Sequence, residues 1–427
     1  MTTINRSAGF LNKERETASA AEWQSYNDEQ VRDLCVMAYR EAPAITKIFA
    51  DAGVTPDDIR GTADLAKLPV TSKSKLAELQ AESPPFGGFL TVPVNELKRI
   101  FMSPGPIYDP QGRVPDFWGW SEGFYAAGFR PQDVVINTFG YQMTPAGLMF
   151  EESLLEIGCC VLPTGVGNTE TQVQLMKNLG VTGFVGMASF LRKIGEKARE
   201  MGIDPRKDLQ LEIGYVAAEI LTDALRAEVE EMYGMILCQG YGTADCGCLA
   251  YECREKSGMH FTSNAYVEIV DPQTAQPLGP GEPGEVVVTM FNPIYPLIRF
   301  GTGDLSAFTD EPCACGRTVP RLTRIMGRVD QITKVKGMFV HPSQADKVVA
   351  GFPQVAKYQI VVTREQNNDI MTFDLEMKEQ PADTDAFTKE FVAAVLDGIK
   401  LRPLVNLLPL DSIVDDGKKI KDERKWD

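Results

Sequence analysis

Apolar residues recur at helical spacing through the first hundred residues of the chain. From Tyr26 to Gly53 they lie three and four positions apart, and the final glycine is a common helix stop. The segment LPVTSKSKLAELQ (68–80) places threonine and serine before a second helical run, where a helix N-cap belongs. This pattern predicts a helical N-terminal region.

Between about residue 130 and residue 300, short apolar runs alternate with amphipathic segments. Strand–helix alternation of this kind is typical of a parallel sheet covered by helices. Glycines follow the predicted strands, at the edge where such sheets bind ligands. The predicted strands are DVVINTFGY (133–141), GCCVLPTGVG (158–167), VTGFVGM (181–187) and LEIGYVAAE (211–219).

The pattern changes again towards the C-terminus. Residues 264–291 read as two strands joined by a turn rich in proline and glycine, which predicts antiparallel pairing. After residues 324–344, the chain reads as a small region of strands followed by helices. We therefore predict an α/β fold whose large N-terminal domain, residues 1–328, has mixed and mostly parallel sheets covered by helices. A small α+β C-terminal lid domain, residues 329–427, completes the predicted organisation.

The chain has 427 residues, a formal net charge of −16 and a sequence pI near 4.8. This acidic balance argues against nucleic acid or an anionic membrane as the main partner, because phosphate groups are bound by basic surfaces. No apolar run approaches the ~18–20 residues of a membrane span, and the N-terminus lacks the pattern of a secretory signal. Nine unevenly spaced cysteines indicate reduced thiols or metal ligands. A cytoplasmic protein is expected.

The chain contains only two histidines, His260 and His341. A serine or cysteine hydrolase, or a zinc enzyme of the two-histidine type, would have to use them. Neither histidine lies in a G-x-S-x-G or H-E-x-x-H pattern. Most hydrolase chemistries are therefore disfavoured.

Three segments carry a set of related motifs: GYGTAD (240–245), PLIRFGTGDL (296–305) and GRVDQITKVKGMFVHPSQ (327–344). They resemble the Y-G-x-S/T-E segment, the P-x-I-R-Y-x-T-x-D-L segment and the hinge segment of the adenylate-forming acyl-CoA ligases. Weaker matches extend the likeness, in the right order, from about residue 65 to residue 345; they are LPVTSKSKL, PPFGGFL, GVGNTETQVQLM and GMASFLRKI. The chain resembles the phenylacetate–CoA ligase family in particular.

The resemblance implies an ATP-dependent, AMP-forming ligase with two half-reactions. A carboxylic acid attacks the α-phosphate of ATP to give acyl-AMP and pyrophosphate, and the thiol of coenzyme A then takes the acyl group and releases AMP. The implied cofactors are ATP, Mg²⁺ and coenzyme A, and the implied substrate is an aryl or arylacetic acid. A carboxylate is already ionised near neutral pH, so this chemistry needs positioning and cations rather than a general base.

The resemblance also implies roles in nucleotide binding. Asp304 would accept hydrogen bonds from the ribose hydroxyls, and Tyr241 would stack on the adenine. Asp245 would hold Mg²⁺ where the family has a glutamate; because it is one methylene shorter, the ion or the chain must shift or a water must bridge. Plain alternatives exist for two residues, since Asp304 can cap a turn and Glu219 can favour a helix N-terminus. The other residues of this set are Ser103, Ala218, Glu219, Gly240, Gly242, Thr243 and Arg328.

Two departures from the family pattern matter. The family's phosphate loop is rich in serine, threonine and glycine, but the matching segment here is FMSPGPIYDPQGR (101–113). Its prolines supply no amide hydrogens and Asp109 adds a negative charge, which leaves Ser103, Gly105 and Arg113 to help. Either ATP is held differently or the first half-reaction is impaired. The second departure is Ala244, where the family has serine or threonine.

The small domain should carry a catalytic lysine and a hinge. The family's lysine follows a glycine near the C-terminus, and DDGKKIKDERKW offers Lys418 or, with a shifted gap, Lys419. Lys421 fits the pattern less well. Asp330 corresponds to the hinge about which the small domain rotates between the half-reactions.

An apolar acyl pocket is expected at TFGYQMTPAG and GMASFL. An aromatic ring would fit between Phe139, Tyr141, Met187 and Phe190. For each of these residues taken singly, ordinary core packing is the simpler interpretation.

The pair Cys313-Ala-Cys315 follows Cys253 and His260 in the sequence. Cys₃His is an established ligand set for structural zinc, and some relatives of the phenylacetate ligases are similar in this respect. We expect these four residues to bind one structural Zn²⁺. The alternative is four unconnected reduced side chains, and Cys246 and Cys248 are expected to serve core packing.

Two rival functions remain open. A related enzyme would pass the adenylated acid to a carrier-protein thiol or an amine, and a non-catalytic binding protein would keep only the fold. The joint presence of Asp304, Asp330 and a Gly-Lys pair argues against the second. The expected oligomer is a homodimer, because two-fold dimers are the commonest assemblies.

Overall fold

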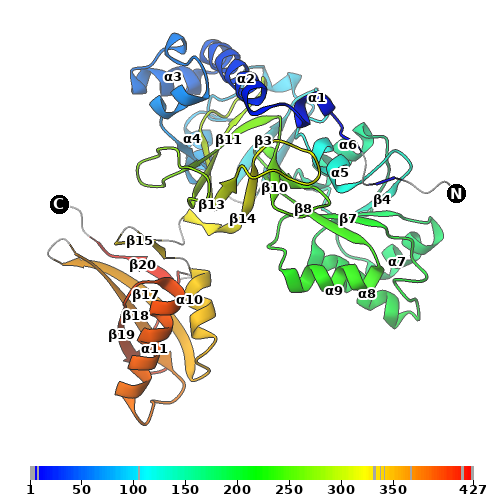
Figure 1. The fold of residues 1–427 in the computed structure, drawn as a ribbon. Coiled ribbons are helices and arrows are strands. Elements are labelled where there is room, and N and C mark those ends of the chain that lie inside the picture. Colours follow the sequence, from blue (N-terminus) through cyan, green and yellow to red (C-terminus); the bar gives the residue numbers. More distant parts are fainter. Residues whose placement is uncertain are drawn as a thin grey trace. The chain divides into compact units, whose positions relative to one another are not determined.

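The computed structural model describes residues 5–6, 9–103, 106–329, 333–336, 338–340, 342–365, 368–414 and 418–424. The chain divides into two compact units (Figure 1). The large unit comprises Met1–Thr302 and Ser306–Ile325, and the small unit comprises Gly303–Leu305 and Met326–Asp427. Within the described residues, no helix has both the length and the apolar character needed to cross a membrane.

The predicted N-terminal helices are present in the large unit. A capping box begins α2, because the Ser19 side chain accepts from the Glu22 amide while the Glu22 carboxylate accepts from the Ser19 amide. Gly53 ends α3 with a φ of 66°, the left-handed conformation that glycine adopts without strain. The helices are α1 (Lys13–Glu16), α2 (Ala20–Glu41), α3 (Pro43–Ala52) and α4 (Leu76–Glu82).

Five parallel strands form one half of the central sheet, in the order β8-β7-β6-β4-β5. The four apolar runs predicted as strands become β4 to β7, which confirms that prediction. Strands β6 and β7 are buried along their whole length, as in a sheet covered on both faces. The strands are β4 (Val134–Asn137), β5 (Cys160–Pro163), β6 (Gly183–Gly186), β7 (Ile213–Val216) and β8 (Ile236–Thr243). The helices of this region are α5 (Ser121–Ala127), α6 (Ala146–Glu156), α7 (Thr169–Asn178), α8 (Ala188–Glu200) and α9 (Asp223–Tyr233).

The sheet continues beyond β8 in the order β9-β10-β14-β13-β12-β11, with β1 (Thr71–Ser72) beside β13. The pairs β8·β9, β9·β10 and β10·β14 are antiparallel. The strand pair predicted within residues 264–291 is confirmed, because β11 and β12 pair in antiparallel register from Ala265↔Met290 to Val270↔Glu285. The bounds are β9 (Gly247–Glu252), β10 (Met259–Phe261), β11 (Ala265–Val270), β12 (Gly284–Met290), β13 (Phe300–Thr309) and β14 (Arg321–Arg328).

A separate two-stranded hairpin forms where the family's phosphate loop was expected. Strands β2 (Arg99–Ser103) and β3 (Ile107–Gln111) pair in antiparallel register, with Phe101 opposite Asp109 and Ser103 opposite Ile107. The second strand of the hairpin is held by α4. The Gln80 side chain of α4 donates to the Tyr108 carbonyl at 2.9 Å and accepts from the Tyr108 amide at 2.8 Å.

The small unit is built around its own four-stranded sheet, in the order β19-β18-β17-β20. Its core includes aromatic residues of β18 and of the following helix, such as Phe373 and Phe391, whose ring centroids are 5.4 Å apart. The elements are β15 (Thr333–Val335), β16 (Met338–Val340), α10 (Pro342–Val349), β17 (Val355–Glu365), β18 (Asn368–Met377), α11 (Thr384–Ile399), β19 (Leu404–Leu408) and β20 (Ile420–Asp422).

The arginine of the PLIRFGTGDL segment, Arg299, has a structural role just before β13. Its side chain is 1% exposed and donates to the carbonyls of Leu68 at 2.8 Å and Ala275 at 2.7 Å. Its Nε also pairs with the buried Glu268 carboxylate at 3.3 Å. One guanidinium therefore joins three segments that are distant in sequence.

Replacing Arg299 by methionine is expected to lower the free energy of unfolding by about 3–5 kcal/mol, because Glu268 would keep a buried charge without its partner. The measurement is chemical denaturation of the purified variant. The matched control is the double variant Arg299→Met/Glu268→Gln, which removes the stranded charge and should recover part of the loss. A single-variant loss below about 1 kcal/mol, the range of an exposed ion pair, would contradict this role.

Candidate functional site

The predicted acyl-pocket residues follow two neighbouring parallel strands, β4 and β6. Phe139 is buried and stacks on Phe150 with ring centroids 4.7 Å apart. The Tyr141 hydroxyl accepts from the Asn137 amide at 2.9 Å. Met187 is the N-cap residue of α8 and is partly exposed, and Phe190 packs against the neighbouring core. Phe139 and Phe190 thus take part in core packing, whatever further role they have.

Ala218 and Glu219 follow β7 in the same layer. Ala218 has a φ of 70°, a left-handed conformation that side-chain-bearing residues rarely adopt and that is often found at functional sites. The Glu219 carboxylate accepts from the Ser189 amide at 2.7 Å and from the Ser189 hydroxyl at 2.8 Å, in the first turn of α8. Glu219 therefore caps the N-terminus of α8, which precedes it in the chain, whereas the alternative interpretation had placed it at the helix that follows its strand.

The GYGTAD segment forms the end of β8 and the turn into β9. Gly240 and Gly242 lie directly against the indole of Trp120, where an added Cβ would come within 2.6 and 2.7 Å of ring carbons. A β-bulge interrupts the β8·β9 register between Tyr241 and Gly242. A Cβ would come closer still to the Tyr215 hydroxyl at Gly240 and to the Gly247 carbonyl at Gly242, so close packing on several sides accounts for both glycines.

The side chains of this turn are well ordered by their neighbours. The Tyr241 ring is buried, and its hydroxyl donates to the Thr302 hydroxyl at 3.1 Å. The Thr243 hydroxyl accepts from the Cys246 amide at 3.2 Å. These contacts place the predicted adenine-binding residues at the end of β8.

Asp304 and Arg328, predicted to contact the ribose and phosphate, form an ion pair within the small unit. The Arg328 Nη1 lies 3.1 Å from the Asp304 Oδ1, and the Asp304 side chain is 18% exposed. Gly303 has a φ of 77°, and a Cβ there would come within 2.7 Å of the Arg328 guanidinium. The predicted hinge residue, Asp330, lies outside the described residues.

The carboxylate predicted to hold Mg²⁺, Asp245, is buried and forms an ion pair with Lys73. Asp109, on β3 of the hairpin, lies next to this pair. Burial, together with the charge of Asp245, raises the pKa of the Asp109 carboxyl to about 7. Although burial acts against it, the Asp245 carboxylate raises the pKa of the Lys73 ammonium. Two carboxyl groups and one ammonium group are therefore concentrated beside the β8–β9 turn.

The two lysines proposed for catalysis differ in their surroundings within the small unit. The Lys419 Nζ pairs with Asp346 at 2.6 Å and lies 5.5 Å from the centroid of the Tyr358 ring. The backbone carbonyl of Lys418 accepts from the Gln359 side chain at 2.9 Å, and its own side chain is exposed.

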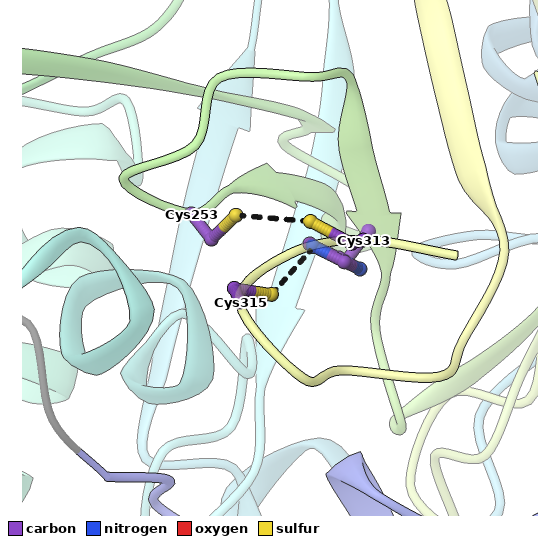
Figure 2. A group of neighbouring side chains, drawn as sticks. Cys253, Cys313 and Cys315 are labelled. Carbon is purple, nitrogen blue, oxygen red and sulfur yellow. Dashed lines mark hydrogen bonds between the residues drawn. The ribbon is translucent and has the colours of Figure 1, made fainter. Parts of the chain in front are cut away.

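Cys253, His260, Cys313 and Cys315 gather into one cluster, with their ligand atoms all within 4.8 Å of one another. Figure 2 shows the three thiol groups converging from a turn after β9 and from the loop between β13 and β14. The Cys253 and Cys313 sulfurs are 3.7 Å apart, and the Cys315 sulfur is 3.5 Å from the His260 Nε2. The other ring nitrogen of His260 lies 3.4 Å from the Val319 carbonyl, the kind of contact that orients a metal-ligating histidine.

The protonation of this cluster is unusual. Hydrogen bonding from the Cys253 thiol, and then from His260, holds the pKa of the Cys315 thiol well below its usual range, to about 2. The same contact with Cys315, together with burial, raises the pKa of the Cys253 thiol. Thiolates are the form in which cysteine binds metal, so the donor set fits a tetrahedral zinc ion.

Comparison with known proteins places the chain in a family. The model described as "AMP-binding enzyme" matches residues 119–291, and the one described as "AMP-binding enzyme C-terminal domain" matches residues 337–424. A phenylacetate-coenzyme A ligase of Thermus thermophilus is 32% identical over 379 residues, which cover 86% of this chain and 84% of the relative. The chain belongs to the AMP-binding enzymes.

Further relatives agree with this assignment. A phenylacetate-coenzyme A ligase of Escherichia coli is 31% identical to this AMP-binding enzyme, with 85% of this chain and 84% of the relative covered. The chain is therefore a member of the phenylacetate–CoA ligase family of adenylate-forming enzymes, as its motifs predicted.

Solved structures share the fold. An open conformation of 2-hydroxyisobutyryl-CoA ligase has a TM-score of 0.88 at 24% identity, covering 99% of this chain and 96% of that one. The unliganded O-succinylbenzoate coenzyme A synthetase of Bacillus subtilis has a TM-score of 0.52 at 14% identity, covering 74% and 69%. The fold of the AMP-binding enzyme is thus the adenylate-forming fold: a mixed α/β sheet with helices, and a small C-terminal sheet domain.

The family matches leave out two of the charged residues beside the β8–β9 turn. The first match contains Gly240–Asp245, and the second contains both candidate lysines. Lys73 and Asp109 precede residue 119 and lie outside both matches. Lys73 falls in the LPVTSKSKL segment, but its partner is 172 residues away, so no local pattern could identify the pair.

Proposed function

We propose that this AMP-binding enzyme activates an aryl or arylacetic carboxylic acid as its acyl-AMP and transfers the acyl group to coenzyme A. The observation that carries the proposal is 30–32% identity to four proteins named phenylacetate-coenzyme A ligase, over 85–89% of this chain. The aromatic side chains of Phe139 and Tyr141, at the carboxyl end of β4, are consistent with an aromatic substrate.

In the proposed reaction, the protein binds and orients the substrates and neutralises charge on the phosphate oxygens. It does not need to abstract a proton. The Asp304 carboxylate accepts hydrogen bonds from the ribose hydroxyls, and the β8–β9 turn lies along the adenine. Arg328 already pairs with Asp304 and can add a phosphate contact. Bound Mg²⁺, held by Asp245, would offset the charge that develops on the phosphate oxygens.

The small unit is proposed to act as the mobile lid, residues 329–427, turning about Asp330. A lysine of this lid, Lys418 or Lys419, would contact the acid carboxylate and the α-phosphate. We also propose that the cluster of three cysteines and His260 holds a structural Zn²⁺, because a closed set of four protein ligands leaves no open position for substrate.

The experiment follows both products. The protein is mixed with Mg-ATP and a panel of phenylacetate, benzoate and indole-acetate, and pyrophosphate and AMP are measured with and without coenzyme A. Pyrophosphate release with an aromatic acid, followed by AMP release that depends on coenzyme A, is the expected result. The control is Asp304→Ala, which should weaken nucleotide binding.

Other outcomes would change the assignment. Pyrophosphate release without AMP release that depends on coenzyme A would indicate a carrier-protein thiol or an amine as the acceptor. No release with any acid would indicate a non-catalytic protein. The β2–β3 hairpin in place of a glycine-rich loop is the observation that keeps this last possibility worth testing.

A further inference from the structure

The hairpin holds one carboxyl group in a fixed and buried position. In the first half of β3, Ile107 and Asp109 are buried while Tyr108 between them is exposed, as successive side chains of a strand point to opposite faces. Asp109 is 1% exposed, and Ser103, on the opposite strand, is 7% exposed. The hairpin cannot easily release this carboxyl group, because Gln80 secures Tyr108 and the Met102 amide donates to the Met143 carbonyl at 2.8 Å.

Buried oxygen atoms meet here without partners. Both carboxylate oxygens of Asp109, the Oδ1 of Asp245 and the hydroxyl of Ser103 are buried and make no hydrogen bond of ordinary geometry with the described residues. The Ser103 hydroxyl and the Asp245 carboxylate nevertheless lie close enough to Asp109 to shift its pKa. Leaving such groups unsatisfied costs about 1–3 kcal/mol each, and more when they are charged. An arrangement of this kind is explained when a water or an ion supplies the missing contacts.

When both acids are ionised, the group that would balance the charges here is a cation. Two carboxylates face one ammonium, Lys73, whose contact is with Asp245. With both acids ionised, the cluster carries one negative charge in excess, which a buried site does not retain without a counter-charge. A divalent cation would leave the cluster with one positive charge, which suits the polyphosphate of ATP.

We propose that Asp109 is a second carboxylate ligand of a divalent-cation site at Asp245, with the Ser103 hydroxyl as a third oxygen. Hard cations such as Mg²⁺ bind one or two carboxylates and keep waters or substrate phosphates in their other positions. The hairpin thus brings a ligand that the shorter Asp245 cannot supply alone. Asp109 adds a negative charge to the segment that replaces the phosphate loop. In this proposal that charge binds the cation.

The proposal depends on the proposed function only in placing the cation beside the nucleotide. Cation binding itself needs neither ATP nor an acid, so it is measured without them. Full-length protein loaded with zinc is titrated with Mn²⁺, and the free ion is followed by electron paramagnetic resonance. An enzyme that proved inactive on every acid could still pass this test.

The variant Asp109→Asn keeps the shape of the side chain and removes its charge. We expect it to bind Mn²⁺ at least about tenfold more weakly than the parent, a loss comparable to or larger than that seen for outer-shell partners. Ser103→Ala should weaken binding less. The matched control is Asp116→Asn, a partly buried carboxyl elsewhere in the large unit that accepts from Ser121 and Ser153; it should leave Mn²⁺ binding unchanged.

Thermal unfolding provides a second measurement, which distinguishes cation binding by Asp109 from a contribution of this residue to folding. Mn²⁺ should raise the unfolding midpoint of the parent but not that of Asp109→Asn, because an ion that binds only the folded state stabilises that state. The proposal is overturned if Asp109→Asn binds Mn²⁺ as tightly as the parent while Asp245→Asn does not. It is also overturned if the parent binds no Mn²⁺ at millimolar concentration.

Discussion

Replacing Cys253 by serine is expected to abolish zinc binding and to lower the thermal unfolding midpoint of the protein by roughly 10 °C or more. Cys253 is buried and contributes one of four ligand atoms that all lie within 4.8 Å of one another. Structural zinc binds with a free energy on the order of 10 kcal/mol, and that energy becomes folding energy when the site exists only in the folded state. Losing one ligand forfeits most of it and leaves the other thiols packed together.

The measurements are metal analysis and a thermal melt, with and without a strong chelator. Parent protein should contain about one zinc per chain, and chelation should bring its midpoint close to that of the variant. Cys35→Ser is the matched control, because it makes the same chemical change at a buried cysteine in a different core cluster. Less than about half an equivalent of zinc in the parent, or equal losses in both variants, would rule out the zinc site.

Replacing Lys418 by alanine is expected to slow acid-dependent pyrophosphate release by about 10²–10³-fold, the usual effect of removing one group that stabilises transition-state charge. Lys419→Ala should slow it far less. The reason is local, since the Lys419 ammonium is held by Asp346 at 2.6 Å on the surface of its own unit. The Lys418 side chain extends from a backbone that Gln359 fixes at 2.9 Å.

Both half-reactions must be measured to interpret these lysines. Thioester formation from supplied acyl-AMP and coenzyme A should change much less than pyrophosphate release in Lys418→Ala, because the lysine is proposed to serve adenylation. Arginine at position 418 should restore part of the rate by returning the positive charge. If Lys419→Ala shows the larger loss, the roles of the two lysines must be exchanged.

Sequence patterns predicted the parts of this protein that depend on local residue order. The apolar runs of β4 to β7 are short and bounded by glycine, so parallel strands followed from them directly. The strand pair around residues 270–284 was predictable from its turn-forming residues. The cluster of cysteines was predictable because Cys313 and Cys315 form a pair, and zinc sites use few ligand combinations.

What could not be predicted depends on contacts between distant segments. Residues 101–113 were matched to the family's phosphate loop, yet Phe101 and Asp109 pair across two strands. Pro110 is tolerated there because a two-stranded hairpin leaves one edge of each strand unpaired. The ion pair of Lys73 with Asp245 spans 172 residues, and the burial that makes Asp109 unusual appears only once the hairpin is packed.

Strand β8 pairs in parallel with β7 on one side and antiparallel with β9 on the other. It is therefore the boundary between the parallel half of the sheet and the half that begins with antiparallel pairs. The GYGTAD segment lies at the end of β8, so a nucleotide bound there would stabilise both halves at once. Ligand binding there would couple the two halves thermodynamically, and the large unit would unfold in one cooperative transition rather than half by half.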